Sequence, residues 1–151
     1  MCLDADTTAV GHRLRQRQDA ASPGALQEIA DLIVNRSDVR LLKPPSPGMV
    51  MVRHSDPLEN TLFLLGETFV TECEVEVDGR LGYGCVLGSV EERALCGALV
   101  DAVLGGGTSA ADHPLKSGIE SLLEVERLRI QARWEAESRA VASTRVSFEV
   151  R

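Results

Sequence analysis

Three histidines are the residues that would first suggest a metal site in this chain. His12, His54 and His113 lie in three different polar segments, and none has a second histidine or a cysteine two, three or four residues further on. Zinc sites of the usual kind bring such ligands together at short spacings. The sequence therefore predicts no metal site of that kind, although a site assembled in space from separate segments stays open.

Two of the four cysteines could form a reactive pair. Cys73 and Cys85 are expected on one face of a β-hairpin, diagonally across from each other. They would suit redox chemistry, or a thiol nucleophile with its base, but free cysteine is more often a small buried residue. Because the chain also has no Cys-x-x-Cys motif, we expect reduced, buried thiols and no catalytic residue here.

Two glycine-rich stretches resemble phosphate-binding or dinucleotide-binding loops without meeting their requirements. Residues 105–109 (Gly-Gly-Gly-Thr-Ser) follow a predicted helix instead of a strand and lack the lysine of a P-loop. Gly82, Gly84 and Gly88 belong to a predicted hairpin strand and its end, whereas the dinucleotide motif lies between a parallel strand and its helix. We expect no bound cofactor.

Acidic residues and glycines are predicted to share one face of the hairpin. Residues 55–78 contain seven acidic side chains and no lysine or arginine. Glu72, Glu74 and Glu76 are expected beside Gly82 and Gly84, where a strand without side chains would admit another backbone. Two interpretations stay open. The face is either a docking surface for a basic partner, or a solvated surface whose glycines mark a bulge or a strong twist.

Two helical residues complete the set of candidate interface residues. Asp101 follows a ridge of small residues, where it would either anchor a partner or ligand, or accept a local hydrogen bond. Trp134 lies in a long helix with apolar residues on two flanks, so it is either a core residue or an exposed interface anchor. The candidate partner interface comprises Glu72, Glu74, Glu76, Gly82, Gly84, Asp101 and Trp134.

The hairpin at 68–87 is the central element that positions these residues. We expect a three-residue loop, Val77-Asp78-Gly79, with Gly79 in the left-handed conformation. This loop pairs Glu76 with Arg80 and separates the apolar side chains from the acidic ones. Further strands are expected at 38–43 (ended by two prolines), 49–52, 62–65 and 145–150, with turn residues at 46–48 and a polar loop at 54–60.

Three helices are predicted with clear start signals. Ser22 caps the first, with Pro23 at its first position, and this helix ends near residue 35. Ser89 and Glu92 form a capping box for the second. The third runs from about residue 114 to 142. The expected fold is α+β: an antiparallel sheet of about four or five strands, with an N-terminal helix, a capped helix after the hairpin and a long C-terminal helix.

Length and charge limit the function classes. The 151 residues suit one domain spanning 1–151, in which residues 1–20 form a loose or partner-ordered arm. A net charge of −7 argues against binding to nucleic acid or to an anionic membrane surface. The N-terminus lacks the pattern of a signal peptide, and no apolar stretch has the length of a membrane span. We expect a cytoplasmic protein.

Several short motifs occur in a familiar order from Gly48 onward. They are Gly-Met-Val-Met-Val at 48–52, Asp-Gly-Arg-Leu-Gly-Tyr at 78–83, Ala-Leu-Val-Asp-Ala at 98–102, pieces of the last helix at 129–137, and Ala-Ser-Thr-Arg-Val-Ser-Phe at 142–148. In their order and spacing the chain resembles the PhnG family of the phosphonate carbon–phosphorus lyase system, over roughly two thirds of its length. It departs from the family pattern in residues 1–20, 53–60 and 105–113.

The resemblance implies a function that composition does not. It implies a non-catalytic subunit of the carbon–phosphorus lyase core complex, which transfers an alkylphosphonate onto the ribose C1′ of ATP with release of adenine. The implied partners are PhnH-, PhnI- and PhnJ-like subunits and a PhnL-like ATPase, with the nucleosidase-type chemistry on the PhnI-like subunit. Two alternatives remain: a stand-alone enzyme or small-anion-binding domain, and a homo-oligomeric structural protein.

Overall fold

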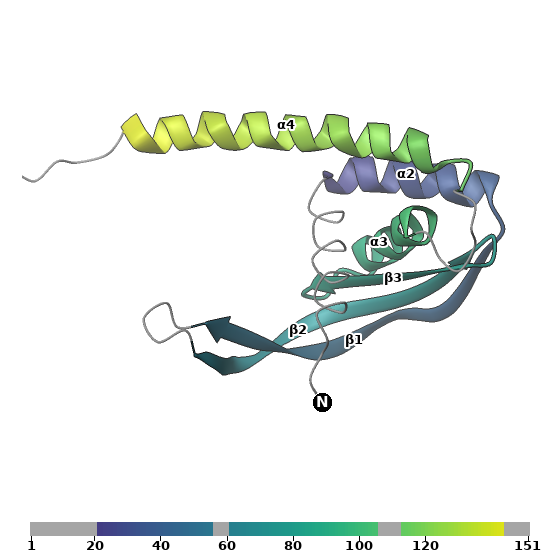
Figure 1. Ribbon diagram of the computed structural model, residues 1–151, viewed down its shortest axis with the longest axis horizontal. Coiled ribbons are helices and arrows are strands. Elements are labelled where there is room, and N and C mark those ends of the chain that lie inside the picture. Colours follow the sequence, from purple (N-terminus) through teal and green to yellow (C-terminus); the bar gives the residue numbers. More distant parts are fainter. Residues whose placement is uncertain (1–20, 56–60, 106–112, 144–151) are drawn as a thin grey trace, which may run out of the picture.

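The computed structural model describes residues 21–55, 61–105 and 113–143, shown in Figure 1. The elements are α2 (Pro23–Arg36), β1 (Val39–Ser55), β2 (Leu62–Val77), β3 (Arg80–Leu87), α3 (Glu91–Leu104) and α4 (Lys116–Ser143). The α+β class and the antiparallel sheet are confirmed, but the described residues form three strands, in the order β1-β2-β3, instead of four or five. The expected strand at 145–150 and the arm at 1–20 lie outside the described residues.

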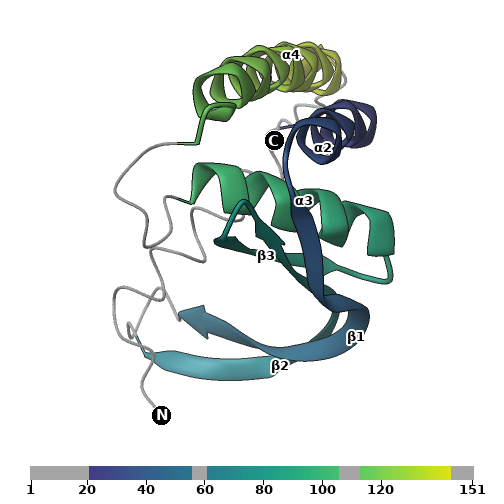
Figure 2. The ribbon, with the colours of Figure 1, turned by 90° about the vertical axis from the view of Figure 1, so that its right-hand side faces the viewer.

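The helices stack in layers on one face of the sheet. α3 packs on β2 and β3, and α2 packs on α3. Figure 2 shows α2 and α4 together in the layer farthest from the sheet. α3 is therefore the central element, and most of its residues from Ala94 to Leu104 are buried. The core is aliphatic; its fully buried side chains include Leu26, Ile33, Val75, Val77, Leu99, Val103 and Ile119.

β1 is one long strand where the sequence suggests two. Prolines at 44 and 45 do not end it, and residues 46–48 are strand instead of turn, so pairing with β2 continues to Ser55. Proline is tolerated here because β1 is an edge strand and its pairing shifts register on both sides of Lys43. The segment 62–65 is likewise the start of β2. These two mergers, together with the position of residues 145–150 outside the described residues, account for the smaller number of strands.

The turn of the β2–β3 hairpin is tighter than expected. Val77 pairs with Arg80, so the loop consists of Asp78 and Gly79, whose φ angles are 49° and 76°. Two positive φ angles are typical of a type I′ turn, which Asp-Gly favours. The predicted three-residue loop, with Glu76 opposite Arg80, is wrong by one residue. In a strand such a shift turns every side chain to the opposite face.

The observed register gives the hairpin an inner face against α3 and an outer face away from it. The inner face carries Thr71, Cys73, Val75, Val77, Arg80, Gly82, Gly84 and Val86, all of them buried. The outer face carries Glu72, Glu74, Glu76, Leu81, Tyr83, Cys85 and Leu87. Acidic and apolar residues are thus mixed on the outer face. The fold accepts this mixture because the inner face is the one that joins the aliphatic core.

α2 begins as the sequence predicts. The Ala25 N–H donates to the Ser22 hydroxyl at 3.4 Å, and Pro23 is the first helical residue. The predicted apolar stripe is buried; it consists of Leu26, Ile29, Ala30 and Ile33. Local signals were sufficient here because both the cap and the stripe lie within one short segment.

α3 starts differently from the prediction. Its N-cap is Val90 and makes no side-chain cap, so capping by Ser89 is wrong. Thr71 of β2 stabilises the turn before the helix, since its hydroxyl donates to the Gly88 carbonyl at 2.6 Å and accepts the Val90 N–H at 3.2 Å. A residue of the neighbouring strand therefore replaces the expected local cap.

α4 runs close to the predicted bounds, but only its first half is anchored. Ile119 and Leu123 are buried, and the Ser22 hydroxyl donates to the buried Glu126 carboxylate at 3.0 Å. From Gln131 onward, every side chain whose burial is described is exposed. Figure 1 shows this half projecting beyond α2. The two apolar flanks predicted for this helix are therefore largely in contact with solvent.

Candidate functional site

The glutamates of the outer face are partly neutralised within the chain. The Lys43 ammonium lies 2.8 Å from the Glu72 carboxylate, and the Arg40 guanidinium lies 3.2 Å from that of Glu76. Both cations come from β1, which the sequence places far from the acidic run. Because β1 supplies them, the predicted docking surface for a basic partner is weaker than the charge run suggests.

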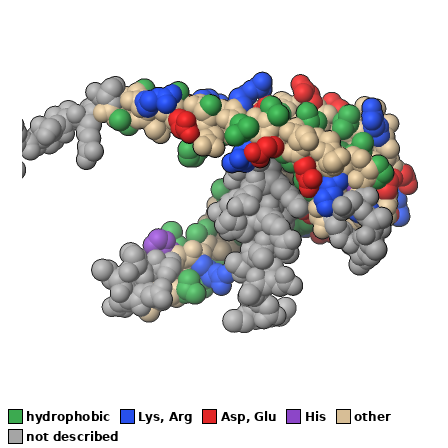
Figure 3. Space-filling model, turned by 45° about the horizontal axis from the view of Figure 1, so that its top comes forward, with side chains coloured by type: hydrophobic (Ala, Val, Ile, Leu, Met, Phe, Trp, Pro, Cys, Tyr) green, Lys and Arg blue, Asp and Glu red, His purple; other side chains and the backbone are tan. Residues whose placement is uncertain are grey.

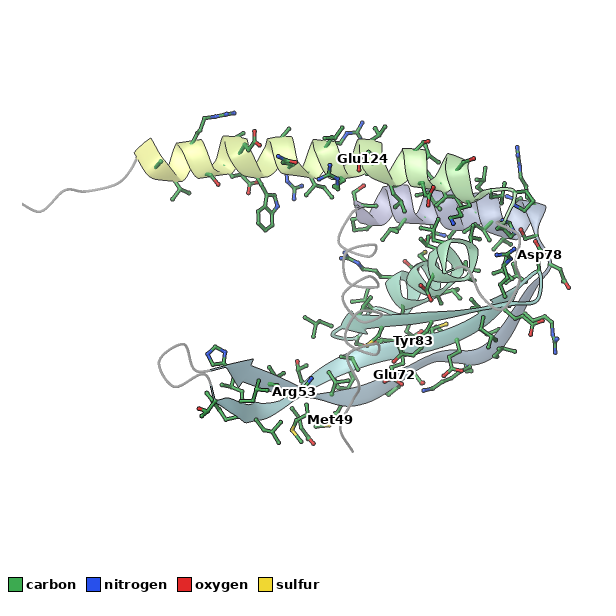
Figure 4. All side chains as sticks on the ribbon, viewed as in Figure 1. Met49, Arg53, Glu72, Asp78, Tyr83 and Glu124 are labelled. Carbon is green, nitrogen blue, oxygen red and sulfur yellow. The ribbon has the colours of Figure 1, made fainter. Side chains whose placement is uncertain are left out.

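Glu72 also belongs to a half-buried polar cluster with Tyr83 and Cys85. The hydrogen bond from Lys43 holds the pKa of Glu72 below its usual value. Burial raises the pKa of Tyr83, and the nearby Cys85 and Glu72 raise it further. Burial likewise raises the pKa of the Cys85 thiol. Figure 4 shows Glu72 and Tyr83 on this part of the sheet. At neutral pH the cluster holds a protonated phenol and thiol, which suits structure better than nucleophilic catalysis.

Gly82 and Gly84 lie on the inner face, against α3, and not beside the glutamates as predicted. A Cβ atom at Gly82 would lie 2.1 Å from the Ala98 carbonyl oxygen, and one at Gly84 would lie 2.0 Å from that of Ala94. The expectation that another backbone approaches these glycines is thus met by the chain's own helix. Their role is to let β3 and α3 pack closely.

Asp101 makes a contact inside the molecule. Its carboxylate accepts the backbone N–H of Tyr83 at 3.2 Å. β3 is an edge strand, and edge strands present backbone groups that can pair with another chain. Of the two interpretations of this residue, the structure shows the local acceptor, which protects one position of the β3 edge.

Trp134 is an exposed side chain of the projecting half of α4. Its exposed fraction is 65%, and the same helix also exposes Leu122, Val125, Leu128 and Val141. A tryptophan of the core is buried, whereas an exposed tryptophan is typical of residues that anchor an interface. Of the seven candidate interface residues, Trp134 keeps the features of such an anchor.

An exposed apolar surface that the sequence did not predict lies at the far end of the sheet (Figure 1). β1 and β2 extend beyond the body as a two-stranded ribbon (Figure 1). We call residues 49–55 and 62–69 the apolar ribbon. Its exposed hydrophobic residues are Met49, Val50, Met51, Val52, Leu62, Phe63, Leu64, Leu65 and Phe69. Figure 3 shows hydrophobic side chains at the surface of both this ribbon and α4. The signal available in the sequence was an apolar stretch without polar alternation, which resembles a buried strand.

His113 forms a buried junction between three elements. Its Nε2 lies 2.9 Å from an Asp78 carboxylate oxygen and 3.5 Å from the Ser37 hydroxyl, and its Nδ1 accepts the Leu115 N–H at 3.1 Å. A catalytic triad would use one ring nitrogen for the acid and the other for the serine. Here both oxygen groups face the same nitrogen, so the junction fixes the start of α4 and is not arranged as a triad.

Two comparisons with known proteins point to the same family. The family described as "Phosphonate metabolism protein PhnG" matches residues 15–151. A protein of Rhizobium meliloti (strain 1021), named "Alpha-D-ribose 1-methylphosphonate 5-triphosphate synthase subunit PhnG", is 29% identical over 153 residues, which cover 97% of this chain and 94% of the relative. The chain belongs to the PhnG family.

In this PhnG family member, Cys73 and Cys85 do not share a face of the hairpin, although the sequence predicted that they would. Cys73 is on the inner face and buried, whereas Cys85 is on the outer face. Burial raises the pKa of the Cys73 thiol, which suits a small core residue. The two thiols were expected together because the predicted register was wrong by one residue.

Metal-ligating side chains do not gather in the described part of this PhnG protein. Within residues 21–55, 61–105 and 113–143, no group of three or more His, Cys, Asp or Glu side chains is placed to hold a metal ion. His54 packs edge-on against Phe63 in the apolar ribbon, with ring centroids 5.4 Å apart.

Among the described helices, none combines the length and the apolar character needed to span a membrane.

Proposed function

We propose that this PhnG family member is a non-catalytic subunit of the carbon–phosphorus lyase core complex. In that complex it would support the transfer of an alkylphosphonate onto the ribose C1′ of ATP, with release of adenine, in phosphonate catabolism. The observation that carries the proposal is the match to a relative named as a synthase subunit, over 97% of this chain and 94% of that one. The proposed location is the cytoplasm.

The positions of the reactive side chains support a structural role for the chain itself. His113 is occupied by three contacts, and the Cys73 thiol is buried in the core. Tyr83 and Cys85 are held in their protonated forms. The exposed apolar surface, by contrast, is large for a protein that acts alone. Its proposed partners are PhnH-, PhnI- and PhnJ-like subunits, with a PhnL-like ATPase.

Co-expression tests this proposal. The chain, carrying an affinity tag, is produced with the PhnH-, PhnI- and PhnJ-like subunits of the same organism, and the purified material is weighed by native mass spectrometry. We expect one complex that contains all four chains and releases adenine from ATP when methylphosphonate is present. A complex of the other three subunits that is stable and equally active without this chain would refute the proposal.

The isolated chain serves as the control, and it separates the alternatives. Calorimetric titration with ATP and with methylphosphonate should show no binding to the chain alone. Tight binding, or turnover by the chain alone, would favour the small-anion-binding domain or a stand-alone enzyme. A defined oligomer of the isolated chain in light scattering, without affinity for the other subunits, would favour the homo-oligomeric structural protein.

A further inference from the structure

The apolar ribbon exposes hydrophobic residues on both of its faces. Successive residues of a strand point to opposite faces, and Met49, Val50, Met51 and Val52 are all exposed, with fractions from 36% to 63%. The opposite strand continues this surface with Leu62 to Leu65. Monomeric proteins rarely expose contiguous apolar patches larger than a few hundred Å². Only an occupant that contacts both faces would cover all of these side chains.

The charge of the ribbon differs from that of the whole chain. Within residues 49–55 and 62–69, Arg53 and Glu67 are the only side chains that carry a formal charge at neutral pH, so the ribbon is formally neutral in a chain of net charge −7. The neutral ribbon itself repels no partner, but a second copy would bring a further net charge of −7 close to that of the first, which opposes self-association of the whole chain. A partner with an apolar, weakly charged surface meets no such barrier.

The arrangement of the strands also decides between possible occupants. A second copy that paired with β1 along its edge would lengthen the sheet and leave both apolar faces in water. Insertion into lipid would leave the backbone groups of the β1 edge without hydrogen-bond partners. A cleft in another protein can cover both faces and can pair with the edge at the same time.

We propose that the apolar ribbon is the element by which this chain docks, and that it inserts into an apolar, weakly charged cleft of a different subunit. This inference rests on the proposed function, because that function supplies the other subunits. It assigns docking to residues 49–55 and 62–69, and not to the acidic outer face, where Arg40 and Lys43 already occupy Glu76 and Glu72.

A matched pair of substitutions tests the inference. Met51 and Leu41 lie on the same strand with exposed fractions of 53% and 54%, but only Met51 belongs to the ribbon. Met51→Asp should weaken assembly with the co-expressed PhnH-, PhnI- and PhnJ-like subunits by at least about tenfold, whereas Leu41→Asp should leave it near the wild-type value. Met51→Leu should assemble like the wild type. Circular dichroism of each isolated variant checks that it is folded.

Each outcome bears on the inference. Assembly of Met51→Asp and of a second variant, Leu64→Asp, at the wild-type level would overturn it and leave the proposed function intact. Failure of the wild-type chain to join any complex would overturn both. A wild-type homodimer that Met51→Asp converts to a monomer would identify a second copy as the occupant. If the wild type binds phosphatidylcholine vesicles and Met51→Asp does not, lipid is the occupant.

Discussion

At the scale of single residues, polar side chains in this protein fasten elements to one another. His113 and Asp78 join the start of α4 to the hairpin turn, and Asp78 also accepts the Asp38 N–H at 2.8 Å. The backbone donor at Asp38, followed by His113, holds the pKa of Asp78 below its ordinary value. The Asp78 carboxyl group is therefore still ionised in the folded protein at pH values at which it is already protonated in the unfolded chain.

Asp78→Asn should reduce the acid sensitivity of folding. A lowered pKa gives stability that is present above the unfolded value of 3.8 and is lost as the pH falls through the lower folded value. Asparagine fits the turn and keeps an oxygen that can accept the Asp38 N–H. At pH 7 we therefore expect the free energy of unfolding to fall by about 1 kcal/mol. The loss is small because Asp78 is partly exposed. Urea unfolding at pH 7, 4 and 3 measures the difference between variant and wild type. If the difference in unfolding free energy stays constant down to pH 3, the ionised Asp78 carboxylate is not its source.

At the scale of elements, the close contact between β3 and α3 organises the molecule. Two glycines of β3 face three alanines of α3 (Ala94, Ala98 and Ala102), and the helix lies so close to the strand that neither glycine position has room for a Cβ atom. The same approach brings Asp101 to the Tyr83 N–H and buries most of the last eleven residues of α3. The sheet and the helix thus form one packed unit, from which the apolar ribbon and the far half of α4 extend.

Gly84→Ala should strongly destabilise the isolated chain. Its Cβ would lie 2.0 Å from the Ala94 carbonyl oxygen, so the helix or the strand must move, at a cost of about 3 kcal/mol, the upper end of the usual range for overpacking. Gly118→Ala in α4 is the control, because a Cβ there meets nothing within 4 Å and alanine favours a helix by up to about 1 kcal/mol. Denaturant unfolding compares the two variants. Equal stabilities would show that the packing is looser than the structure indicates.

At the scale of the whole molecule, two elements with exposed hydrophobic side chains project to the same side of the body (Figures 1 and 3). One is the apolar ribbon and the other is the half of α4 that carries Trp134. Within residues 49–54, 62–69 and 131–142, no side chain is buried. In a subunit of a complex, such surfaces are complemented by partners, so the isolated chain can be folded while part of its apolar surface remains unsatisfied.

Trp134→Ala should separate folding from assembly. With 65% of the residue exposed, its loss should change the unfolding free energy of the isolated chain by less than about 0.5 kcal/mol. If a partner covers it, the same change should weaken the complex by about tenfold or more. Unfolding of the isolated variant and dissociation of the co-expressed complex are measured in parallel. A loss of stability without any loss of assembly would mean that Trp134 serves the fold.

The sequence by itself determined the features that depend on neighbouring residues. The cap and stripe of α2, the existence of the hairpin, the small-residue character of α3 and the extent of α4 all follow from local periodicity and turn chemistry. Motifs that are short but ordered also indicated the PhnG family before any fold was known, because their spacing survives where single residues differ.

Only the tertiary structure decided what each face meets. The one-residue register of the hairpin placed Gly82 and Gly84 against α3 and separated Cys73 from Cys85. β1 continues through its prolines because, among the described residues, no further strand pairs with its other edge. The sequence predicted separate short strands at 49–52 and 62–65, and only the fold showed that they belong to one exposed apolar ribbon. Burial, pairing and charge balance arise between segments distant in the chain, so local patterns do not contain them.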